Sequence, residues 1–232
     1  MTQIISYKQI EDVEGFRPQN GMNFKTKNKN YSIVLMSVRE NSPYDDKISD
    51  DGKTIDYVGH NLNKKYCKGK DPYTFDQPLF LPSGKLTQNG KFAKAANYFK
   101  DGLQEPEKVR VYQKIKKGLW SFDGVFNLVD VSQEQSNGRS IHLFKLILTN
   151  ENLDEFREDN DELPEDDRII PGHVQLEVFK RDKGQCVEYG SKDHLHFDHI
   201  LPFSKGGTSK DKKNIRLLCR RHNLKKSNKV GG

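Results

Sequence analysis

Runs of apolar residues and alternating polar and apolar positions predict strands over much of the first 150 positions. Four segments have a strand pattern: residues 31–38, 108–112, 124–130 and 141–148. The outer two are apolar runs typical of buried strands, and the inner two alternate in polarity. The one clear helical pattern, TQNGKFAKAANYFK, spans residues 87–100. Several strands with little helix favour a barrel or a strongly curved sheet.

The pattern changes after residue 150. From Glu151 to Asp167 about ten acidic residues stand against one arginine, a composition typical of a solvated linker. Three elements are expected beyond it: a helix over 173–181, a strand entering a loop over 195–203, and a loop running into a final helix over 214–223. The chain is therefore expected to consist of an N-terminal domain over 1–150, an acidic linker over 151–170 and a compact C-terminal domain over 171–232.

Composition narrows the class of protein. The 232 residues are 33% hydrophobic and 31% charged, which is lean but globular. No stretch of about 18 apolar residues occurs and the first residues lack a signal-peptide pattern, so we expect a cytoplasmic, prokaryotic protein with no membrane partner. Three cysteines fit a reducing compartment. The net charge of +6 and the pI near 9.0 favour a polyanionic partner.

The adjacent pair Asp198-His199 offers the two functions that phosphodiester hydrolysis requires. A carboxylate binds a hard divalent cation that neutralises charge on the phosphate, and an imidazole accepts the proton of the attacking water. A second oxygen or nitrogen ligand must come from elsewhere. His222 and Asn223, in the expected final helix, are candidates.

An ordered series of residues around this pair resembles the HNH nuclease family. The matching residues are Asp198-His199-Ile200, Pro202, Ser204 to Gly207, Asn214, Leu217 to Cys219, His222-Asn223 and Lys226. The resemblance implies a ββα-metal fold that holds one catalytic ion, Mg²⁺ or Mn²⁺, through Asp198 and Asn223. It also implies that His199 is the general base and that Asn214 braces the loop. A competing assignment makes His222 the catalytic ligand.

Many members of this family also hold a structural zinc between two Cys-x-x-Cys pairs. Here the pairs read Cys186-x-x-Tyr189 and Cys219-x-x-His222. Zinc accepts a histidine in place of a thiolate, whereas a neutral phenol is a poor ligand. Either His194 or His196 supplies the fourth ligand, or the zinc is absent and packing replaces it. We expect a weakened or absent zinc.

The final helix is rich in basic residues. Those near the expected nuclease site are Arg220, Arg221, Lys225 and Lys226. They fit either a solvated helix face or contacts with DNA phosphates, and the neighbouring site favours phosphates, which would make binding sensitive to salt.

The N-terminal part carries a second series of residues that resembles a known family. The series contains Tyr31 to Leu35, Pro43 to Asp46, Asp50 to Gly52, Asp56 to His60, Asp76 to Leu79, Asn89, Val109 to Val111 and Phe122-Asp123-Gly124. Their order resembles the SRA domain, or YDG family, which flips a modified cytosine out of DNA into a pocket. The resemblance spans about residues 16–148.

This second resemblance implies a pocket for a flipped base. Extrusion costs a few kcal/mol, which aromatic stacking and hydrogen bonds to the base edge recover. Tyr57 is implied as one stacking aromatic and Tyr44 as a second, with Asp45 or Asp46 as the acceptor for the cytosine amine. Asp50 is an alternative acceptor, and the acidic residues of this segment also fit a solvated surface turn.

Together these features predict an α+β protein in which an SRA/PUA-like curved β-barrel is joined by the acidic linker to a small ββα-metal domain. The expected function is endonucleolytic cleavage of double-stranded DNA that carries 5-methylcytosine or 5-hydroxymethylcytosine. A single site cuts one strand, so a homodimer is a further expectation. Two rivals are a non-catalytic reader of modified DNA and a generic HNH nicking enzyme; the intact Asp198-His199 pair and the aromatic and acidic cluster of residues 44–57 argue against them.

Overall fold

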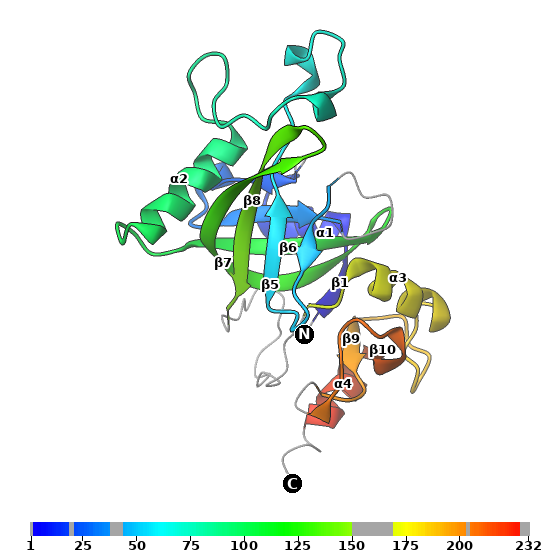
Figure 1. The fold of residues 1–232 in the computed structure, drawn as a ribbon. Coiled ribbons are helices and arrows are strands. Elements are labelled where there is room, and N and C mark those ends of the chain that lie inside the picture. Colours follow the sequence, from blue (N-terminus) through cyan, green and yellow to red (C-terminus); the bar gives the residue numbers. More distant parts are fainter. Residues whose placement is uncertain (1, 19–20, 38–43, 150–168, 203–204, 228–232) are drawn as a thin grey trace.

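The computed structural model describes residues 2–18, 21–37, 44–149, 169–202 and 205–227 (Figure 1). The strands are β1 (Thr2–Ser6), β2 (Met22–Asn23), β3 (Ser32–Met36), β4 (Lys47–Ile48), β5 (Thr54–Val58), β6 (Glu107–Lys116), β7 (Leu119–Ser136), β8 (Arg139–Leu148), β9 (Leu195–His199) and β10 (Ile215–Cys219). The α-helices are α1 (Tyr7–Glu14), α2 (Gln88–Lys100), α3 (Gly172–Arg181) and α4 (Arg220–Ser227). Mixed strands and helices confirm the predicted α+β class.

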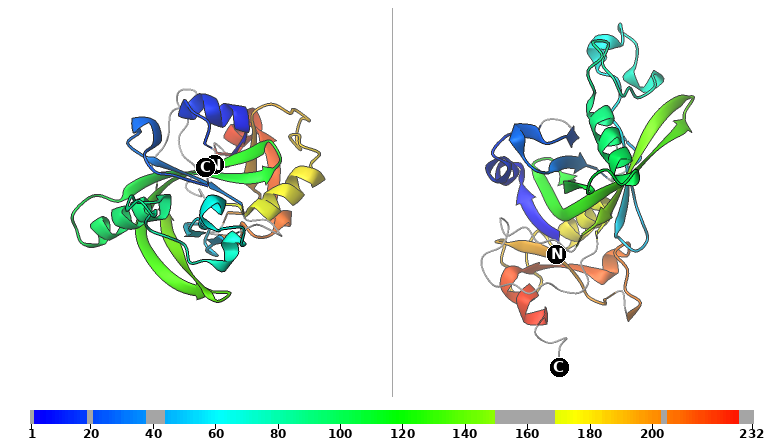
Figure 2. Two further views of the ribbon diagram at one scale, coloured as in Figure 1. Left: turned by 90° about the horizontal axis from the view of Figure 1, so that it is seen from above. Right: turned by 90° about the vertical axis from the view of Figure 1, so that its left-hand side faces the viewer.

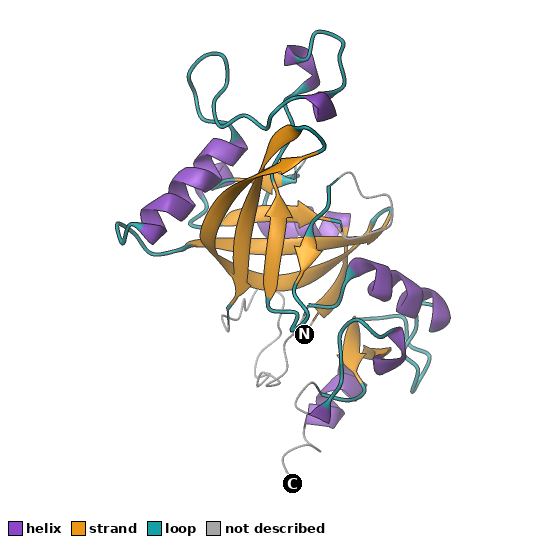
Figure 3. Cartoon of the chain, in the orientation of Figure 1, coloured by secondary structure: helices purple, strands orange, loops and turns teal. Residues whose placement is uncertain are grey.

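A strongly curved sheet forms the larger part of the molecule (Figure 3). β7 is its long central strand: its first half pairs with β1 and β6, and its second half pairs with β8. β8 continues the sheet to β5 and β4, and β6 continues it through a parallel pairing with β3 and then β2. The predicted barrel or curved sheet is therefore confirmed.

The core of this curved sheet is closed by α2, which lies across the strands (Figure 1). Thr87 caps the helix, since its hydroxyl accepts a hydrogen bond from the backbone N–H of Gly90. Gly90 allows close packing, because a Cβ there would lie 2.1 Å from the carbonyl oxygen of Leu79. Phe92 is fully buried, which stabilises the fold by about 1.5–3 kcal/mol.

The C-terminal part is a hairpin of β9 and β10 followed by α4, with α3 packed beside it. This ββα unit lies below the curved sheet in the right-hand view of Figure 2. β9 also pairs with β1, so the hairpin continues the ladder of the larger sheet. Within the described residues no helix is long and apolar enough to cross a membrane.

Two expectations about the C-terminal part need correction. Residues 215–219 were expected as a loop before a helix, but they form strand β10, because Ile215 and Leu217 are buried and the segment pairs with β9. The expected linker over 151–170 ends in two buried residues, Ile169 and Ile170. Residues 151–168 lie outside the described part of the chain.

Candidate functional site

The β9–β10 hairpin positions Asp198 and holds its carboxylate beside a cation. Asp198 lies opposite Arg216 in the strand register, and the Nε of Arg216 donates a hydrogen bond to its Oδ2 at 3.0 Å. The same guanidinium donates from Nη1 to Glu188 at 3.0 Å. The Asp198 carboxylate therefore forms a charge-assisted hydrogen bond with Arg216 in a largely buried position.

His199 ends strand β9 and is oriented by a buried serine. Its Nε2 lies 2.8 Å from the Oγ of Ser209, within hydrogen-bond distance. Ser209 comes from the loop between the two strands and is buried. Sequence reasoning missed this residue, since a serine in a polar loop carries no signal of its own.

Asn214 ties the loop between the strands together. Its Oδ1 accepts from the backbone N–H of Leu201 at 2.8 Å, and its Nδ2 donates to the carbonyl oxygens of Leu201 and Thr208 at 3.0 and 3.1 Å. Gly207 permits this closure, because a Cβ there would lie 1.8 Å from the Leu201 carbonyl oxygen. Asn214 acts on the backbone of the loop that follows His199.

Helix α4 packs against β9 and β10 and carries Asn223, which is buried. A carboxylate from Asp198 and an amide oxygen from Asn223 are hard donors, the kind that Mg²⁺ and Mn²⁺ prefer. The donor chemistry of the hairpin and helix therefore fits the predicted catalytic ion.

The basic residues of α4 differ in exposure. Arg221 and Lys225 are exposed, whereas Arg220 is partly buried and its backbone N–H donates to the carbonyl oxygen of His194. The side chain of Lys226 lies outside the described part of the chain. Two of the four predicted phosphate contacts are thus on the surface.

A cluster of soft donors lies at the base of the hairpin. The Nδ1 of His222 is 3.4 Å from the Sγ of Cys186 and 3.2 Å from the Sγ of Cys219. Burial raises the pKa of the Cys186 thiol, but hydrogen bonds from the backbone N–H groups of residues 219, 188 and 189 outweigh it, and the net shift lowers the pKa. The cluster suits a thiophilic ion such as Zn²⁺.

The fourth ligand considered for this cluster is missing among the described residues. The cluster consists of Cys186, Cys219 and His222, and the ligand atoms of these three residues lie within 4.8 Å of one another. Neither His194 nor His196 belongs to this group of three, and their proposed role as fourth ligand stays a prediction. Tyr189 is 77% exposed, so its phenol points to solvent.

In the curved sheet, the two candidate acids have opposite environments. Asp46 is only 6% exposed, and its Oδ1 accepts from the backbone N–H of Val58 at 2.9 Å. Burial raises its pKa to about 7. The side chain of Asp45 is 87% exposed and lies 3.5 Å from Lys47. Asp50 is also exposed and pairs with Lys210. Only Asp46 of these three acids faces inward.

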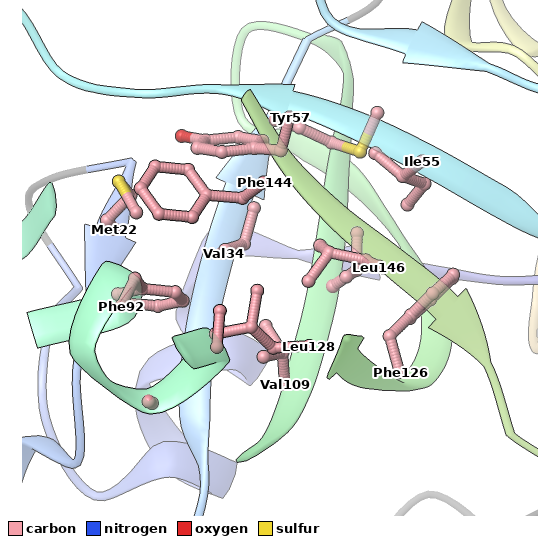
Figure 4. Close-up of a cluster of buried hydrophobic side chains, with 14 of the residues drawn as sticks. Met22, Val34, Ile55, Tyr57, Phe92, Val109, Phe126, Leu128, Phe144 and Leu146 are labelled. Atoms are coloured by element: carbon pink, nitrogen blue, oxygen red, sulfur yellow. The ribbon is translucent and has the colours of Figure 1, made fainter. Parts of the chain in front are cut away.

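The predicted aromatic pair is present, with different burial of its two members. Tyr44 is partly buried and stacks on His60, with ring centroids 6.5 Å apart and an interplanar angle of 24°. Tyr57 on β5 is 2% exposed and its ring lies among core side chains such as Phe144 (Figure 4). Burial raises the pKa of Tyr57, with smaller contributions from the nearby Asp46 and Tyr44.

His60 and Gly21 lie beside these two tyrosines, and the sequence reasoning gave neither of them a role in the site. Burial lowers the pKa of His60 to about 4, and its neutral Nε2 accepts from the backbone N–H of Met22 at 2.9 Å. A Cβ at Gly21 would lie 2.5 Å from the Tyr57 hydroxyl and 3.0 Å from His60 Nε2. Glycine therefore allows the Tyr57 hydroxyl and the His60 ring to pack closely against the backbone at this position.

Three polar residues fix the backbone that follows β5. Asn89 accepts from the backbone N–H of His60 at 2.8 Å, and Gln77 donates to the carbonyl oxygen of Gly59 at 2.5 Å. Arg139 donates to Asn61 at 2.7 Å and lies over the ring of Tyr73, 5.4 Å from its centroid. These hydrogen bonds hold residues 59–61 beside Tyr44 and Tyr73.

Comparisons with known proteins give three kinds of result. None of the curated proteins compared with the chain matches it. Among solved structures, the SUVH5 SRA domain in complex with hemi-methylated CG DNA is 21% identical, covers 69% of this chain and 90% of that chain, and has a TM-score of 0.43. The same domain bound to fully hydroxymethylated CG DNA is 20% identical, with the same coverage and TM-score.

A third solved structure is the Type IV phosphorothioation-dependent restriction endonuclease ScoMcrA. It is 16% identical and covers 84% of this chain and 46% of that chain, with a TM-score of 0.34. The family model described as HNH endonuclease matches residues 184–229, which contain the hairpin, its loop and α4. The C-terminal part of this chain is therefore an HNH endonuclease domain, and the protein is a nuclease.

Proposed function

We propose that the protein is a modification-dependent DNA endonuclease, in which the curved sheet reads a flipped 5-methylcytosine or 5-hydroxymethylcytosine and the HNH domain cuts the strand. The observation that carries the proposal is a buried carboxyl group, Asp46, close to aromatic rings in a sheet that belongs to the same chain as a nuclease hairpin. Burial of a carboxyl group is costly, and the backbone hydrogen bonds that Asp46 accepts from Val58 and Ser37 leave it acceptor capacity for the amine of a bound base.

Recognition rests on Asp46, Tyr44 and Tyr57. A cytosine presents an N4 amine, which donates to an ionised Asp46, whereas a thymine presents a carbonyl oxygen that the carboxylate repels. Tyr44 leaves its stack on His60 to cover one face of the base, and Tyr57 lies on the other side. The neutral His60 adds no charge to the pocket.

In the nuclease site, His199 takes the proton from a water whose oxygen forms the new bond to phosphorus. The bond from phosphorus to the 3′ oxygen breaks, and that oxygen leaves as the alkoxide and then gains a proton. Ser209 keeps the His199 ring in position through its hydrogen bond. Asp198 and Asn223 would hold the divalent ion, which supplies positive charge for the phosphate and the leaving oxygen. Arg216 neutralises Asp198 from the opposite strand.

The cluster of Cys186, Cys219 and His222 holds a scaffold zinc in this proposal. Structural zinc sites in proteins have four protein ligands, and this one has three within the described residues. The ion is therefore bound more weakly than in a four-ligand site. Metal analysis of purified protein, before and after dialysis against a chelator, measures its stoichiometry; absence of zinc before dialysis contradicts the assignment.

Double-strand cleavage calls for two nuclease sites, because each chain carries one HNH domain. We therefore propose that two copies act together on a duplex. Sedimentation of the protein with and without modified duplex tests this point, and a monomer on DNA that still cuts both strands at once would contradict it.

The decisive experiment compares matched duplexes that are unmodified, methylated or hydroxymethylated, digested with Mg²⁺ or Mn²⁺. The proposal expects cutting of at least one modified duplex at a rate well above that of the unmodified one. Equal cutting of all three would leave an HNH nuclease without modification dependence. Absence of cutting with retained, selective binding would leave a reader of modified DNA.

A further inference from the structure

Strand β1 connects the curved sheet with the nuclease hairpin. On one edge it pairs with β7, from Gln3 opposite Phe122 to Ser6 opposite Leu119. On its other edge it pairs with β9, with Gln3 opposite His196. Figure 1 shows β1 between the two parts. The hydrogen-bonded ladder is therefore continuous from the sheet of the pocket to the strand that carries Asp198 and His199.

The hydrophobic core of the HNH domain includes residues from the N-terminal part. The shared cluster contains Ile4, Ile115, Leu119, Ile170, Val174, Val178, Leu195, Phe197, Ile215 and Leu217. The first three come from β1, from the end of β6 and from the start of β7. The Nζ of Lys116, the last residue of β6, also lies 4.5 Å from the ring centroid of Phe179 on α3. The hairpin alone has few apolar residues, so separation from the sheet would expose the side chains that pack against Ile4, Ile115 and Leu119.

Gln113 joins the two parts through a buried hydrogen-bond network. Its Nε2 donates to Asp123 Oδ2 at 2.8 Å and to the carbonyl oxygen of Ile170 at 3.0 Å, and its Oε1 accepts from the N–H of Gly172 at 2.7 Å. Ser121 donates to Asp123 Oδ1 at 2.9 Å. Gln113, Ser121 and Asp123 are all buried. A satisfied buried network specifies one geometry, because any slip leaves polar groups unpaired in the interior.

The chain passes from one part to the other between two consecutive buried residues. Ile169 packs in the core of the curved sheet and the next residue, Ile170, packs in the core of the HNH domain. The N–H of Ile169 donates to the carbonyl oxygen of Gly52, and the helix of residues 172–181 begins directly afterwards. The join between the parts is therefore independent of residues 151–168.

We propose that the curved sheet and the HNH domain act on DNA as one rigid body, and that Gln113 and Asp123 are positioning residues that set the distance from the modified base to the cut. This proposal rests on the proposed function for its DNA readout. It differs from an arrangement on a tether, in which the acidic segment 151–168 would set the reach and scatter the cuts.

The first experiment maps cut positions on a duplex with one modified cytosine. The wild-type chain is compared with a chain that has about ten glycine and serine residues inserted after Asn160. The rigid body predicts one narrow range of distances that is the same in both chains. A range that spreads or moves when the insertion is made overturns the proposal, whereas loss of modification dependence in both chains overturns the proposed function instead.

A second experiment tests the join without DNA. A protease site inserted after Asn160 allows the full chain to be cut between its two parts, which should then elute together in gel filtration because β1, the shared core and Gln113 hold them. Elution as two separate fragments refutes the rigid body, whatever the nuclease result.

Variants of the network separate positioning from folding. Asp123→Asn places an amide donor opposite the Nε2 of Gln113, and Gln113→Ala removes three hydrogen bonds. Both should widen the range of cut positions while selective binding of the modified duplex is retained. The control is Lys117→Ala, on the exposed turn between β6 and β7. A cut range as narrow in both network variants as in the control would contradict the role of the network.

Discussion

The proposed base-binding site and the proposed catalytic site differ in how far their polar groups are exposed to water. In the first, Asp46 and Tyr57 are almost fully buried, and Tyr57 lies in the hydrophobic cluster of the curved sheet. In the second, Asp198 and His199 are partly buried on a short hairpin and are oriented by the side chains of Arg216 and Ser209. The difference suits the proposed tasks, because selective hydrogen bonding is strongest away from water, whereas hydrolysis consumes a water molecule.

The curved sheet and the HNH hairpin also differ in what stabilises them. The curved sheet has its own core and an α-helix to close it, but the HNH hairpin takes part of its core from β1 and the β6–β7 turn. A small unit that buries few apolar residues is stabilised by such borrowing and by a metal. Changes in the hairpin are therefore expected to affect catalysis and local order, and changes in the sheet to affect recognition.

The largest expected effect is on His199. The variant His199→Ala should lower the cleavage rate by about 10²–10⁴-fold or more, since it removes the general base, while the affinity for modified DNA stays near that of the wild type. Single-turnover cleavage and a binding assay on the same duplex measure both quantities. Cleavage at the wild-type rate would remove His199 from the mechanism. Ser209→Ala, which leaves the ring but removes its partner, should give a smaller loss.

Loss of the soft-donor cluster should act on the hairpin alone. Cys219→Ser should remove bound zinc and increase hydrogen exchange of β9 and β10, while exchange in β5 and β8 stays unchanged. Val187→Ser, an exposed position in the same loop, is the control. Equal loss of protection in both parts would mean that the hairpin and the sheet unfold as one cooperative unit, and the contrast in stability would be wrong.

Substitution of Asp46 tests the proposed recognition of the base by the curved sheet. Asp46→Ala should weaken binding of the duplex that carries a modified cytosine by about 10–100-fold, the value of a lost hydrogen bond to a charged group. Cleavage of whatever duplex is bound should continue, because His199 and Asp198 are untouched. Asp45→Ala, at the exposed neighbouring position, should leave this binding unchanged. Equal effects of the two substitutions would place the acceptor elsewhere.

The raised pKa of Asp46 gives recognition a pH dependence. Burial raises this pKa to about 7, so the acid is mostly neutral near pH 6 and mostly ionised near pH 8. An ionised carboxylate is the better acceptor, and the affinity for the duplex with a modified cytosine should therefore rise over this range. Binding titrations of that duplex at several pH values measure it. An affinity that stays constant or falls would show that Asp46 does not accept the amine in its charged form.

The raised pKa of Asp46 also makes the stability of the fold depend on pH. An acid whose folded pKa lies above its unfolded value costs free energy of folding once the pH exceeds the unfolded value, and this cost grows until the folded value is passed. Asp46→Asn keeps an oxygen for the Val58 N–H without the charge. The variant should therefore melt at a higher temperature than the wild type near pH 8 and at a similar one near pH 4, as thermal unfolding would report.

The smallest effect is expected on α4. Arg221→Ala and Lys225→Ala, at exposed positions, should weaken binding to modified and unmodified duplexes equally and each lower the salt dependence by about one counterion. A change in the preference between duplexes would place these residues near the base pocket. Such a result would mean that recognition and cleavage do not belong to separate regions of the protein.

The sequence determined those features that depend on neighbouring residues. Asp198 and His199 are adjacent in the chain, and Cys219 and His222 are separated by only two residues. Strands β3, β6, β7 and β8 follow from local patterns of polarity. The match of residues 184–229 to the HNH endonuclease family confirmed the nuclease prediction, which rested on such local spacing.

Only the tertiary structure decided the features that depend on burial and on contacts between distant segments. Asp45 and Asp46 are equivalent in sequence, yet one is solvated and the other lies beneath the sheet. Tyr189 stands at the spacing of a zinc ligand but points to solvent, and Gln113 joins two parts whose connection had been expected in the acidic segment. Burial arises from the packing of segments that are far apart in the chain, so the local pattern of residues does not contain it.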